Sequence, residues 1–332
     1  PLTKEDPEMR GKSTSQKAMK WANRFRLTEK MYGYVIEILK SGRCTRLDGI
    51  DAQVKDRLDA WGELQQIHGV GPSAARTLFN KGFTTVAELR GAVELEAAAR
   101  ATPSATGNDN HKLKPILNPT QMIGLRHHAD LQVRIPRDEV REIAAFVEVH
   151  AQALHPGAVV ECCGSYRRGK TSSGDCDVMI TMPRDKYGHD VAFPLQTLLD
   201  RLRKVGFLVD DLSNSSDSEV EGGMKQTYMG VCRLPQRVFC RRIDIKTFPR
   251  SMWAFAKLYF TGSDWFNRSM RLWSKKLGWT LSDKGLSEAF RSRNEGKVFS
   301  GESLACESER EIFEKLGLEY VSPKLRSPDL FR

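Results

Sequence analysis

Four short runs of apolar and β-branched residues in the middle of this chain constrain its fold more than any other feature. Each run has the length and composition of a β-strand, and the four cover residues 158–163, 176–181, 227–232 and 242–248. Residues 193–205, between the second and third runs, repeat apolar positions at three- and four-residue spacing, which predicts a helix. Helix-like segments flank the runs on both sides, so we expect an α+β protein of several domains around a mixed β-sheet.

Outside the four runs we expect mainly helices, because apolar positions recur with helical spacing. The helix-like segments are 21–40 ending near Gly42, 53–90 with a break at Gly69–Pro72, 136–153, 253–260 and 265–277. Two other stretches are expected to be irregular. Residues 97–118, rich in Ala, Thr, Ser, Asn and Pro, predict a flexible insertion, and the acidic, Ser-rich residues 210–223 predict an exposed loop.

The 52 Lys and Arg residues exceed the 42 Asp and Glu residues by ten, which favours a polyanionic partner but fits a soluble basic enzyme equally well. Seven cysteines without a CxxC pair argue against a zinc site or a secreted disulfide framework and favour a reducing compartment. Every apolar run is shorter than the roughly 18 residues of a membrane-spanning helix, so we expect no membrane partner. Because the chain opens on Pro1 rather than Met, we expect a longer protein.

Three aspartates stand out in the strand-like runs. Asp175 and Asp177 lie two positions apart at the start of one run, so their carboxylates project from the same face, and Asp244 lies between two isoleucines in another run. Carboxylates that meet at one site repel one another unless a cation compensates, and a pair of Mg²⁺ ions can activate a hydroxyl and neutralise a leaving phosphate. An isolated Asp-x-Asp pair is more often a solvated strand end, so neighbouring residues must decide.

A small and basic turn precedes the first two aspartates. Gly164-Ser165 closes the first strand-like run, and Tyr166–Lys170 adds a hydroxyl and several cations. Backbone N–H groups and arginine side chains in such a turn can bind a triphosphate. A basic surface loop is the alternative for Arg167 and Lys170.

These residues together resemble a known family. Gly164-Ser165 followed by Gly174-Asp175-Cys176-Asp177 resembles the signature of the family X DNA polymerases, within the nucleotidyltransferase superfamily. The resemblance continues in family order through 241–245, 259–263 and 266–271 and covers roughly residues 30–332. It implies a hand-like polymerase with a nucleotidyltransferase-type mixed-sheet palm, helical fingers and an α/β thumb. The implied domains are a reduced lyase-like helical segment at 1–52, fingers at 53–136, the catalytic palm at 137–250 and the nucleotide-selecting thumb at 251–332.

The resemblance also implies a role for each matching residue. Asp175, Asp177 and Asp244 would ligate two Mg²⁺ ions, for which Mn²⁺ can substitute, and Asp244 would receive the proton of the primer 3′-hydroxyl. The residues that match the nucleotide site are Arg134, Gly164, Ser165, Arg168 and Gly174 around the triphosphate, Tyr259, Phe260 and Gly262 along the sugar, and Asp264 and Asn267 against the nascent base pair. Arg271 matches a contact to the template strand. Template-independent relatives carry Gly-Trp where this chain has Tyr259-Phe260, which favours templated DNA synthesis.

Residues 67–75 have the form of a helix-hairpin-helix, a DNA-binding motif of the family, although a plain turn between helices would look similar. Free N–H groups at the start of the second helix can bind a DNA phosphate without reading sequence. The residues of this expected DNA contact are Gly69, Gly71, Ser73 and Ala74. The resemblance implies that the carbonyls of Gln65, Ile67 and Val70 bind Na⁺ or K⁺ there, while His68 is expected to be a turn residue and no catalytic base.

The N-terminal lyase domain of the family is incomplete in this chain. Tyr34 stands where the family has a lysine that forms a Schiff base, and Phe25–Lys30 replaces a glycine hairpin. Tyrosine cannot form an imine, so we expect little or no lyase activity, with Lys30 as the one nearby substitute.

The resemblance implies a gap-filling DNA polymerase of base excision repair or end joining. Its expected partners are gapped or nicked double-stranded DNA, a dNTP, and repair proteins that bind a region before Pro1. We expect a monomer in the nucleus, with the mitochondrion as a second location. Two alternatives remain, a template-independent nucleotidyltransferase and a DNA-end-binding scaffold with weak catalysis.

Overall fold

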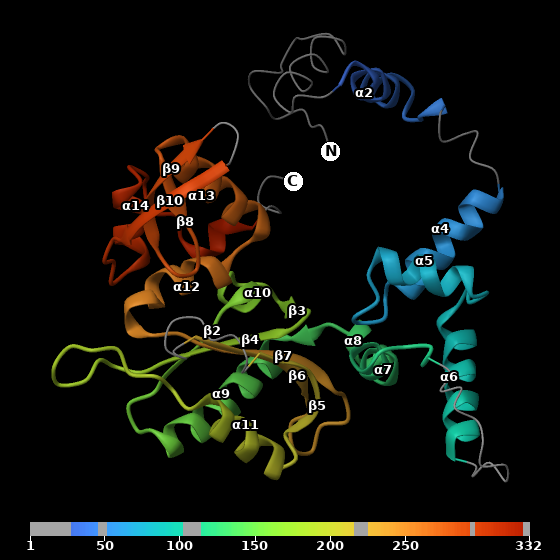
Figure 1. Cartoon of the computed structure of the whole chain (residues 1–332), viewed down its shortest axis with the longest axis horizontal. Coiled ribbons are helices and arrows are strands. Elements are labelled where there is room, and N and C mark those ends of the chain that lie inside the picture. Colours follow the sequence, from blue (N-terminus) through green and yellow to red (C-terminus); the bar gives the residue numbers. More distant parts are fainter. Residues whose placement is uncertain (1–27, 46–51, 102–113, 216–224, 293–295, 328–332) are drawn as a thin grey trace. The chain divides into compact units, whose positions relative to one another are not determined.

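The computed structural model describes residues 28–45, 52–101, 114–215, 225–292 and 296–327 (Figure 1). The chain divides into two compact units, which are Pro1–Gln66 with Val70–Ser104 and Ile67–Gly69 with Ala105–Arg332. Among the described residues, no helix has both the length and the apolar composition needed to cross a membrane.

The described residues of the first unit form helices. These are α2 (Glu29–Ser41), α4 (Ala52–Leu64), α5 (Pro72–Asn80) and α6 (Val86–Ala101). Helix α2 ends as predicted at Gly42, whose φ of 71° is the left-handed conformation that glycine adopts most readily. The start predicted at residue 21 lies outside the described residues.

Two expectations for the first unit are wrong. The region 53–90 has a second break, between α5 and α6, where the Glu88 carboxylate accepts the backbone N–H of Thr84 at 2.8 Å and so begins a new helix. Helix α6 also runs to Ala101, so the first part of the predicted insertion 97–118 is helical, because its alanines favour a helix. At the other end of that stretch Asn118 caps the next helix, and residues 102–113 lie outside the described part of the chain.

A five-stranded mixed sheet forms the centre of the second unit. Its strand order is β2-β4-β7-β6-β5, with β4 and β7 parallel and the other neighbours antiparallel. The strands are β2 (Val159–Cys162), β4 (Cys176–Thr181), β5 (Leu208–Ser215), β6 (Gln226–Cys232) and β7 (Arg241–Thr247). The four predicted strand runs are therefore confirmed, as is the α+β class.

Helices α9 (Arg137–Leu154) and α11 (Leu195–Lys204) cover one face of this sheet (Figure 1). Both were predicted from their apolar spacing. Val140 and Ile143 of α9 and Leu198 of α11 are fully buried against Val178 and Ile245 of the strands. Because side chains alternate along a strand, Asp177 and Asp244 must project from the opposite face.

The predicted loop 210–223 is wrong in its first part. Residues up to Ser215 belong to β5, which pairs antiparallel with β6, and residues 216–224 lie outside the described part. The acidic residues favoured a loop in the prediction. In the structure they fit an edge strand, which leaves Asp210 and Asp211 partly exposed while Leu212 is buried. Both aspartates form ion pairs, with Arg126 and Arg203 respectively.

Other elements of the second unit precede, interrupt or follow the strands of this sheet in the chain. The elements α7 (Pro119–Arg126), α8 (His128–Gln132) and β1 (Ile135–Pro136) precede β2. Between β2 and β4 come α10 (Gly164–Arg167) and β3 (Ser172–Ser173), and β3 pairs with β1. After it come η2 (Arg250–Met252), α12 (Trp253–Thr261), α13 (Asp264–Lys276), α14 (Glu309–Lys315) and η3 (Pro323–Arg326).

A three-stranded antiparallel sheet, β10-β9-β8, packs among these C-terminal helices. Its strands are β8 (Trp279–Leu281), β9 (Leu286–Ser292) and β10 (Gly296–Ser303). The expectation of mainly helical structure after residue 249 is wrong here, because these strands mix polar and apolar residues and carry no continuous apolar run. The α/β character implied by the family resemblance is correct.

Candidate active site

The structure brings together the three carboxylates that were predicted to meet. Strands β4 and β7 run parallel with Asp177 opposite Asp244, and Asp175 lies two residues before Asp177 on the same side. One oxygen of each carboxylate lies within 4.8 Å of the others. The pairing of β4 with β7 thus brings Asp244 beside Asp177 and Asp175, which lie 67 and 69 positions earlier in the chain.

Basic side chains partly neutralise this acidic cluster. Lys246 Nζ lies 3.0 Å from Asp244 Oδ2 and 3.5 Å from Asp177 Oδ1, and the Arg242 guanidinium contacts the Asp175 carboxylate. Arg242, Asp244 and Lys246 alternate along β7 and so share one face. Sequence reasoning missed both cations, although this same two-residue spacing could have revealed them.

The two cations do not fully compensate the negative charge of the three carboxylates. Burial raises the pKa of Asp177, and the nearby Asp244 carboxylate raises it further, against the opposing effects of Lys246 and Arg168. Asp244 is 7% exposed, and its Oδ1 has no hydrogen-bond partner in the described part of the chain. An unpartnered buried carboxylate oxygen is costly, and a cation would satisfy it.

Gly164 leaves room beside these oxygens. Its φ is 53°, and a Cβ at this position would overlap the Asp177 carboxylate. Three carboxylates, one orphaned oxygen and a side-chain-free wall fit hard divalent cations such as Mg²⁺.

The predicted triphosphate residues surround the turn at α10. Arg168 Nη1 donates to the carbonyl of Thr261 at 2.6 Å, and its Nε is buried without a partner among the described residues. Burial lowers the pKa of Arg168 while Asp177 opposes that shift. Ser165 Oγ donates to Ser173 Oγ at 2.8 Å, and Arg134 donates to Ser172 through Nε at 2.8 Å. A Cβ at Gly174 would meet open space, so this backbone can be approached closely.

The predicted sugar and base residues lie at the junction of α12 and α13. Tyr259 and Phe260 lie in the last turn of α12, with their ring centroids 5.0 Å apart in an edge-to-face arrangement. Gly262 turns the chain with φ 66°, and a Cβ there would lie 3.1 Å from Arg168 Nη1, so the sugar and triphosphate residues adjoin. Asn267 Nδ2 donates to the Tyr259 carbonyl at 2.7 Å, and the Arg271 guanidinium lies 4.7 Å from the Tyr259 ring centre.

Asp264 is the most exposed member of this group. It begins α13 after the Ser263 cap, and its side chain is 73% exposed while pairing with Arg268 at 3.2 Å. A side chain this accessible can contact a ligand without rearrangement of the core.

The predicted helix-hairpin-helix has the expected turn. Gly69 has φ 84°, and Gly71 caps α5 in an extended conformation without a side-chain cap. The first amides of a helix lack intrahelical acceptors, so those of Ser73 and Ala74 are available to an anion. The Gly69 carbonyl accepts from Gln121 Nε2 at 3.1 Å.

The predicted carbonyl ligands of this motif stay a prediction. Gln65 follows α4, Val70 precedes Gly71, and Ile67 is 1% exposed. Gln65 and Val70 belong to the first unit and Ile67 to the second. His68, expected to be a turn residue, has its pKa lowered by burial and by Arg242, while Asp244 opposes that shift.

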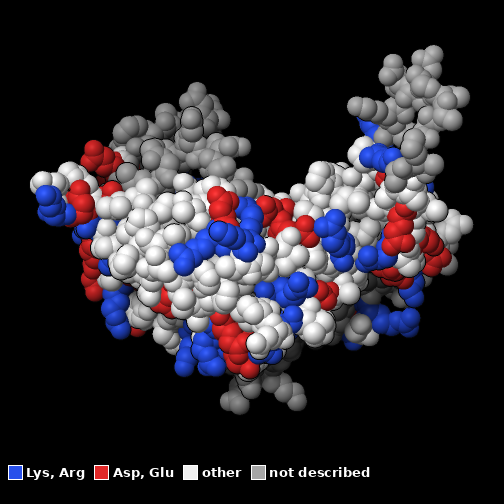
Figure 2. All heavy atoms as spheres, turned by 90° about the horizontal axis from the view of Figure 1, so that it is seen from below, with Lys and Arg blue, Asp and Glu red and all other residues white. Residues whose placement is uncertain are grey.

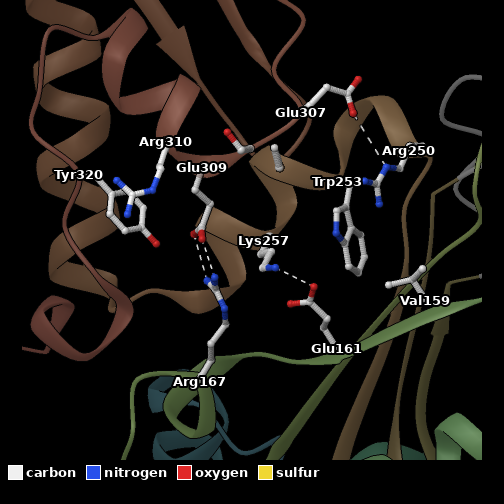
Figure 3. A pocket seen from close by; sticks show the side chains of 12 residues that line it. Val159, Glu161, Arg167, Arg250, Trp253, Lys257, Glu307, Glu309, Arg310 and Tyr320 are labelled. Carbon is white, nitrogen blue, oxygen red and sulfur yellow. Dashed lines mark hydrogen bonds and ion pairs between the residues drawn. The ribbon is translucent and has the colours of Figure 1, made fainter.

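A cavity of about 370 Å³ lies elsewhere in the second unit, between β2, α12 and α14 (Figure 3). It contains none of the three aspartates. Within it Lys257 pairs with Glu161 at 2.7 Å, and Arg167 forms a two-bond pair with Glu309. The ion pairs in this cavity therefore link β2 to α12 and α10 to α14.

Comparison with known proteins is consistent with this arrangement. A family model described as the DNA polymerase beta palm matches residues 134–250, and one described as the DNA polymerase beta thumb matches residues 256–327. DNA polymerase lambda of Rattus norvegicus is 39% identical over 305 residues, which cover 91% of this chain and 46% of that protein. DNA polymerase lambda of Arabidopsis thaliana is 32% identical over 301 residues, which cover 90% of this chain and 51% of that protein.

A third relative, the DNA-directed DNA/RNA polymerase mu of Homo sapiens, is 28% identical over 316 residues, covering 88% of this chain and 57% of that protein. The chain thus spans about half the length of these relatives. With palm and thumb matched in order and the three carboxylates gathered on the palm sheet, the chain belongs to the family X DNA polymerases and is close to DNA polymerase lambda.

Proposed function

We propose that this protein is a templated DNA polymerase that fills short gaps by adding dNTPs to a primer 3′-hydroxyl with release of pyrophosphate. The observation that carries the proposal is the meeting of Asp175, Asp177 and Asp244 within 4.8 Å on the palm sheet. Phosphoryl transfer needs positioning and charge neutralisation more than covalent help from the protein.

Two divalent ions, Mg²⁺ or in its place Mn²⁺, would supply this neutralisation when bound to the three carboxylates. Asp175 and Asp177 would hold both ions, and Asp244 would hold one of them and receive the proton of the primer hydroxyl. The buried Oδ1 of Asp244, which has no hydrogen-bond partner among the described residues, supports ion binding at this carboxylate.

The triphosphate would bind at the turn that follows β2. Arg168, whose Nε has no partner among the described residues, and Arg134 would supply positive charge, while Ser165, Gly164 and the open backbone of Gly174 would supply hydrogen-bond donors. The leaving pyrophosphate is thereby held in place as its charge increases.

The thumb side would select the nucleotide and the template. Tyr259, Phe260 and Gly262, at the end of α12, would form a wall along the sugar, where a 2′-hydroxyl would clash. Asp264 and Asn267, in the first turn of α13, would contact the nascent base pair. Arg271, held over the Tyr259 ring, would contact the template strand.

The test is primer extension on a one-nucleotide gapped duplex with Mg²⁺ or Mn²⁺. Asp244→Ala should reduce extension by about 10²–10⁴-fold while DNA binding stays largely intact. Asp200→Ala, an exposed acid on α11, is the matched control and should extend normally. Unchanged extension by Asp244→Ala would refute the assignment.

The two alternatives are separated by the same assay. Addition of nucleotides without a template strand would indicate a template-independent nucleotidyltransferase. Binding of DNA ends with no incorporation on any substrate would indicate a scaffold. The presence of all three palm carboxylates favours an enzyme.

The DNA partner would be gapped or nicked double-stranded DNA in nuclear base excision repair or end joining. The uncapped start of α5 supports a phosphate contact through Gly69, Gly71, Ser73 and Ala74. Na⁺ or K⁺ would assist at the carbonyls of Gln65, Ile67 and Val70. The domain division into 1–52, 53–136, 137–250 and 251–332 belongs to this proposal, as do the monomeric state and any repair-protein partners.

Lyase activity should be weak or absent. Tyr34 lies on α2 at the position of the family's lysine and cannot form an imine. Borohydride trapping on an abasic 5′-flap should give no adduct. An adduct that disappears in the Lys30→Ala variant would contradict this expectation.

A further inference from the structure

A second group of metal-ligating side chains lies in the second unit, away from the palm carboxylates. His127, Asp130 and Cys240 each offer one ligand atom, and these atoms lie within 4.8 Å of one another. The three residues come from separate elements. His127 links α7 to α8, Asp130 lies in α8, and Cys240 immediately precedes β7.

The group is largely buried, with Asp130 partly exposed, and it is already ordered. His127 is 9% exposed and Cys240 is 5% exposed. Asp130 Oδ2 accepts the backbone N–H of Cys240 at 2.9 Å, which fixes the carboxylate beside the thiol.

A fourth residue orients the histidine. Asp210 Oδ2 lies 2.6 Å from His127 Nε2. Arg126 Nη1 donates hydrogen bonds to both carboxylate oxygens of Asp210, each at 3.0 Å. Metal-binding histidines commonly have such a carboxylate on the ring, which fixes the orientation and raises the basicity of the imidazole. The cluster therefore has both a ligand set and a supporting hydrogen bond.

We propose that His127, Asp130 and Cys240 form a transition-metal site of the Zn²⁺ type, separate from the polymerase centre. The donors are one nitrogen, one oxygen and one sulfur, a set that Zn²⁺ accepts in tetrahedral geometry and that hard Mg²⁺ does not prefer. Three protein ligands leave one position for water. Binding would release the thiol proton, because the thiolate is the ligand.

The ion would fasten α7 and α8 to the start of β7. Asp244 follows Cys240 by four residues on that strand, so the site would brace the palm strand that carries a catalytic carboxylate. The absence of a CxxC pair predicted that this chain has no zinc site. The proposed site needs no such pair, because it uses a single cysteine with a histidine and an aspartate that are distant in sequence.

Cobalt titration of the full chain tests the proposal, because Co²⁺ bound by a thiolate has a charge-transfer absorption that oxygen ligands do not produce. Asp244→Asn can be used as background so that the palm site contributes little. We expect one equivalent of Co²⁺ to saturate the band and Zn²⁺ to displace it. Absence of a saturable band in the parent protein would overturn the proposal, as would a band that needs many equivalents.

Variants assign the ligands. Cys240→Ser should lose the charge-transfer band, whereas Cys44→Ser, outside this cluster, should keep it. Asp210→Asn should keep the band and weaken affinity about 10–100-fold, as expected of a residue that orients a ligand. His127→Gln keeps the Cys240 thiolate and so keeps the charge-transfer band, but it should bind Co²⁺ more weakly. Unchanged affinity for Co²⁺ in this variant would contradict the ligand set, even if Cys240→Ser folds poorly.

Discussion

At the scale of single residues, Gly164 controls the space around Asp177. A Cβ there would overlap the carboxylate, and the φ of 53° disfavours any other residue. Gly164→Ala should lower the free energy of unfolding by about 1–3 kcal/mol, as overpacking does, and should reduce extension by displacing the carboxylate. Urea unfolding and gap filling measure the two effects.

The control for that substitution is Gly91→Ala, inside helix α6, where a Cβ meets open space. It should be neutral or stabilise by about 0.5–1 kcal/mol. A Gly164→Ala protein as stable and active as the parent would show that the carboxylate can move without consequence.

Lys246 acts as an internal counter-ion for Asp177 and Asp244. Lys246→Met should lower the free energy of unfolding by about 3–5 kcal/mol without metal, because two buried carboxylates lose their partner. Added Mg²⁺ or Mn²⁺ should recover much of this loss, since the ions take over the compensation. Thermal melts with and without metal measure the difference.

Lys257→Met is the matched control for this prediction. Its ion pair with Glu161 is partly exposed and remote from the aspartates, so the metal-induced shift of the melting temperature should equal that of the parent. Equal shifts in Lys246→Met and the parent would contradict a counter-ion role.

At the scale of elements, Glu309 joins the thumb helix α14 to the palm helix α10. Arg167 Nη2 lies 2.5 Å and Arg326 Nη1 2.7 Å from its carboxylate oxygens. Burial alone would raise the pKa of Glu309, but hydrogen bonds and charges from Arg167 and Arg326 outweigh it and hold that pKa below its ordinary value of 4.5. The stability from this network is therefore present above pH 4.5 and lost as the pH falls through the lower folded value.

Glu309→Gln should lower the free energy of unfolding by about 3–5 kcal/mol at neutral pH, because two buried arginines lose their charge partner. The difference from the parent should shrink as the pH falls below 4.5. Urea unfolding across this range measures it. Glu307→Gln, whose side chain is half exposed, should cost at most about 1 kcal/mol. A pH-independent loss in Glu309→Gln would mean that packing, not charge, explains the network.

Sequence predicted the elements with strong periodicity and missed those whose signal was mixed. Helices α9 and α11 and the strands β2, β4, β6 and β7 were predictable because one face or the whole element is apolar. Strand β5 was missed because Asp210 and Asp211 are typical of a loop, whereas in the fold they pair with Arg126, 84 residues earlier, and Arg203, 8 residues earlier. The strands of the thumb were missed because none has an uninterrupted apolar run.

The candidate site was predictable to a similar degree. The spacing of Asp175 and Asp177 places both on one side, but only pairing of β4 with β7 in register sets Asp244 beside them. The pairing of Arg167 with Glu309, 142 residues later, left no local trace in the sequence.

At the scale of the whole molecule, the excess of ten positive charges predicts salt-sensitive binding to DNA. On the face shown in Figure 2, Lys and Arg lie among Asp and Glu, so net charge alone does not outline a binding surface there. With about six to ten phosphate contacts, affinity for a gapped duplex should fall about 10³–10⁵-fold between 50 and 200 mM salt. Fluorescence anisotropy across a salt series measures the slope, and affinity independent of salt would argue against phosphate contacts.

The parallel pairing of β4 and β7 also decides when the protein becomes chemically competent during its biosynthesis. Parallel strands cannot be joined by a hairpin, so the polypeptide between Thr181 and Arg241 must cross over before Asp244 reaches Asp177. A nascent chain or proteolytic fragment that stops short of β7 holds only two of the three acids. Under the proposed function, such incomplete products would add no nucleotide to a primer, because the third carboxylate is missing.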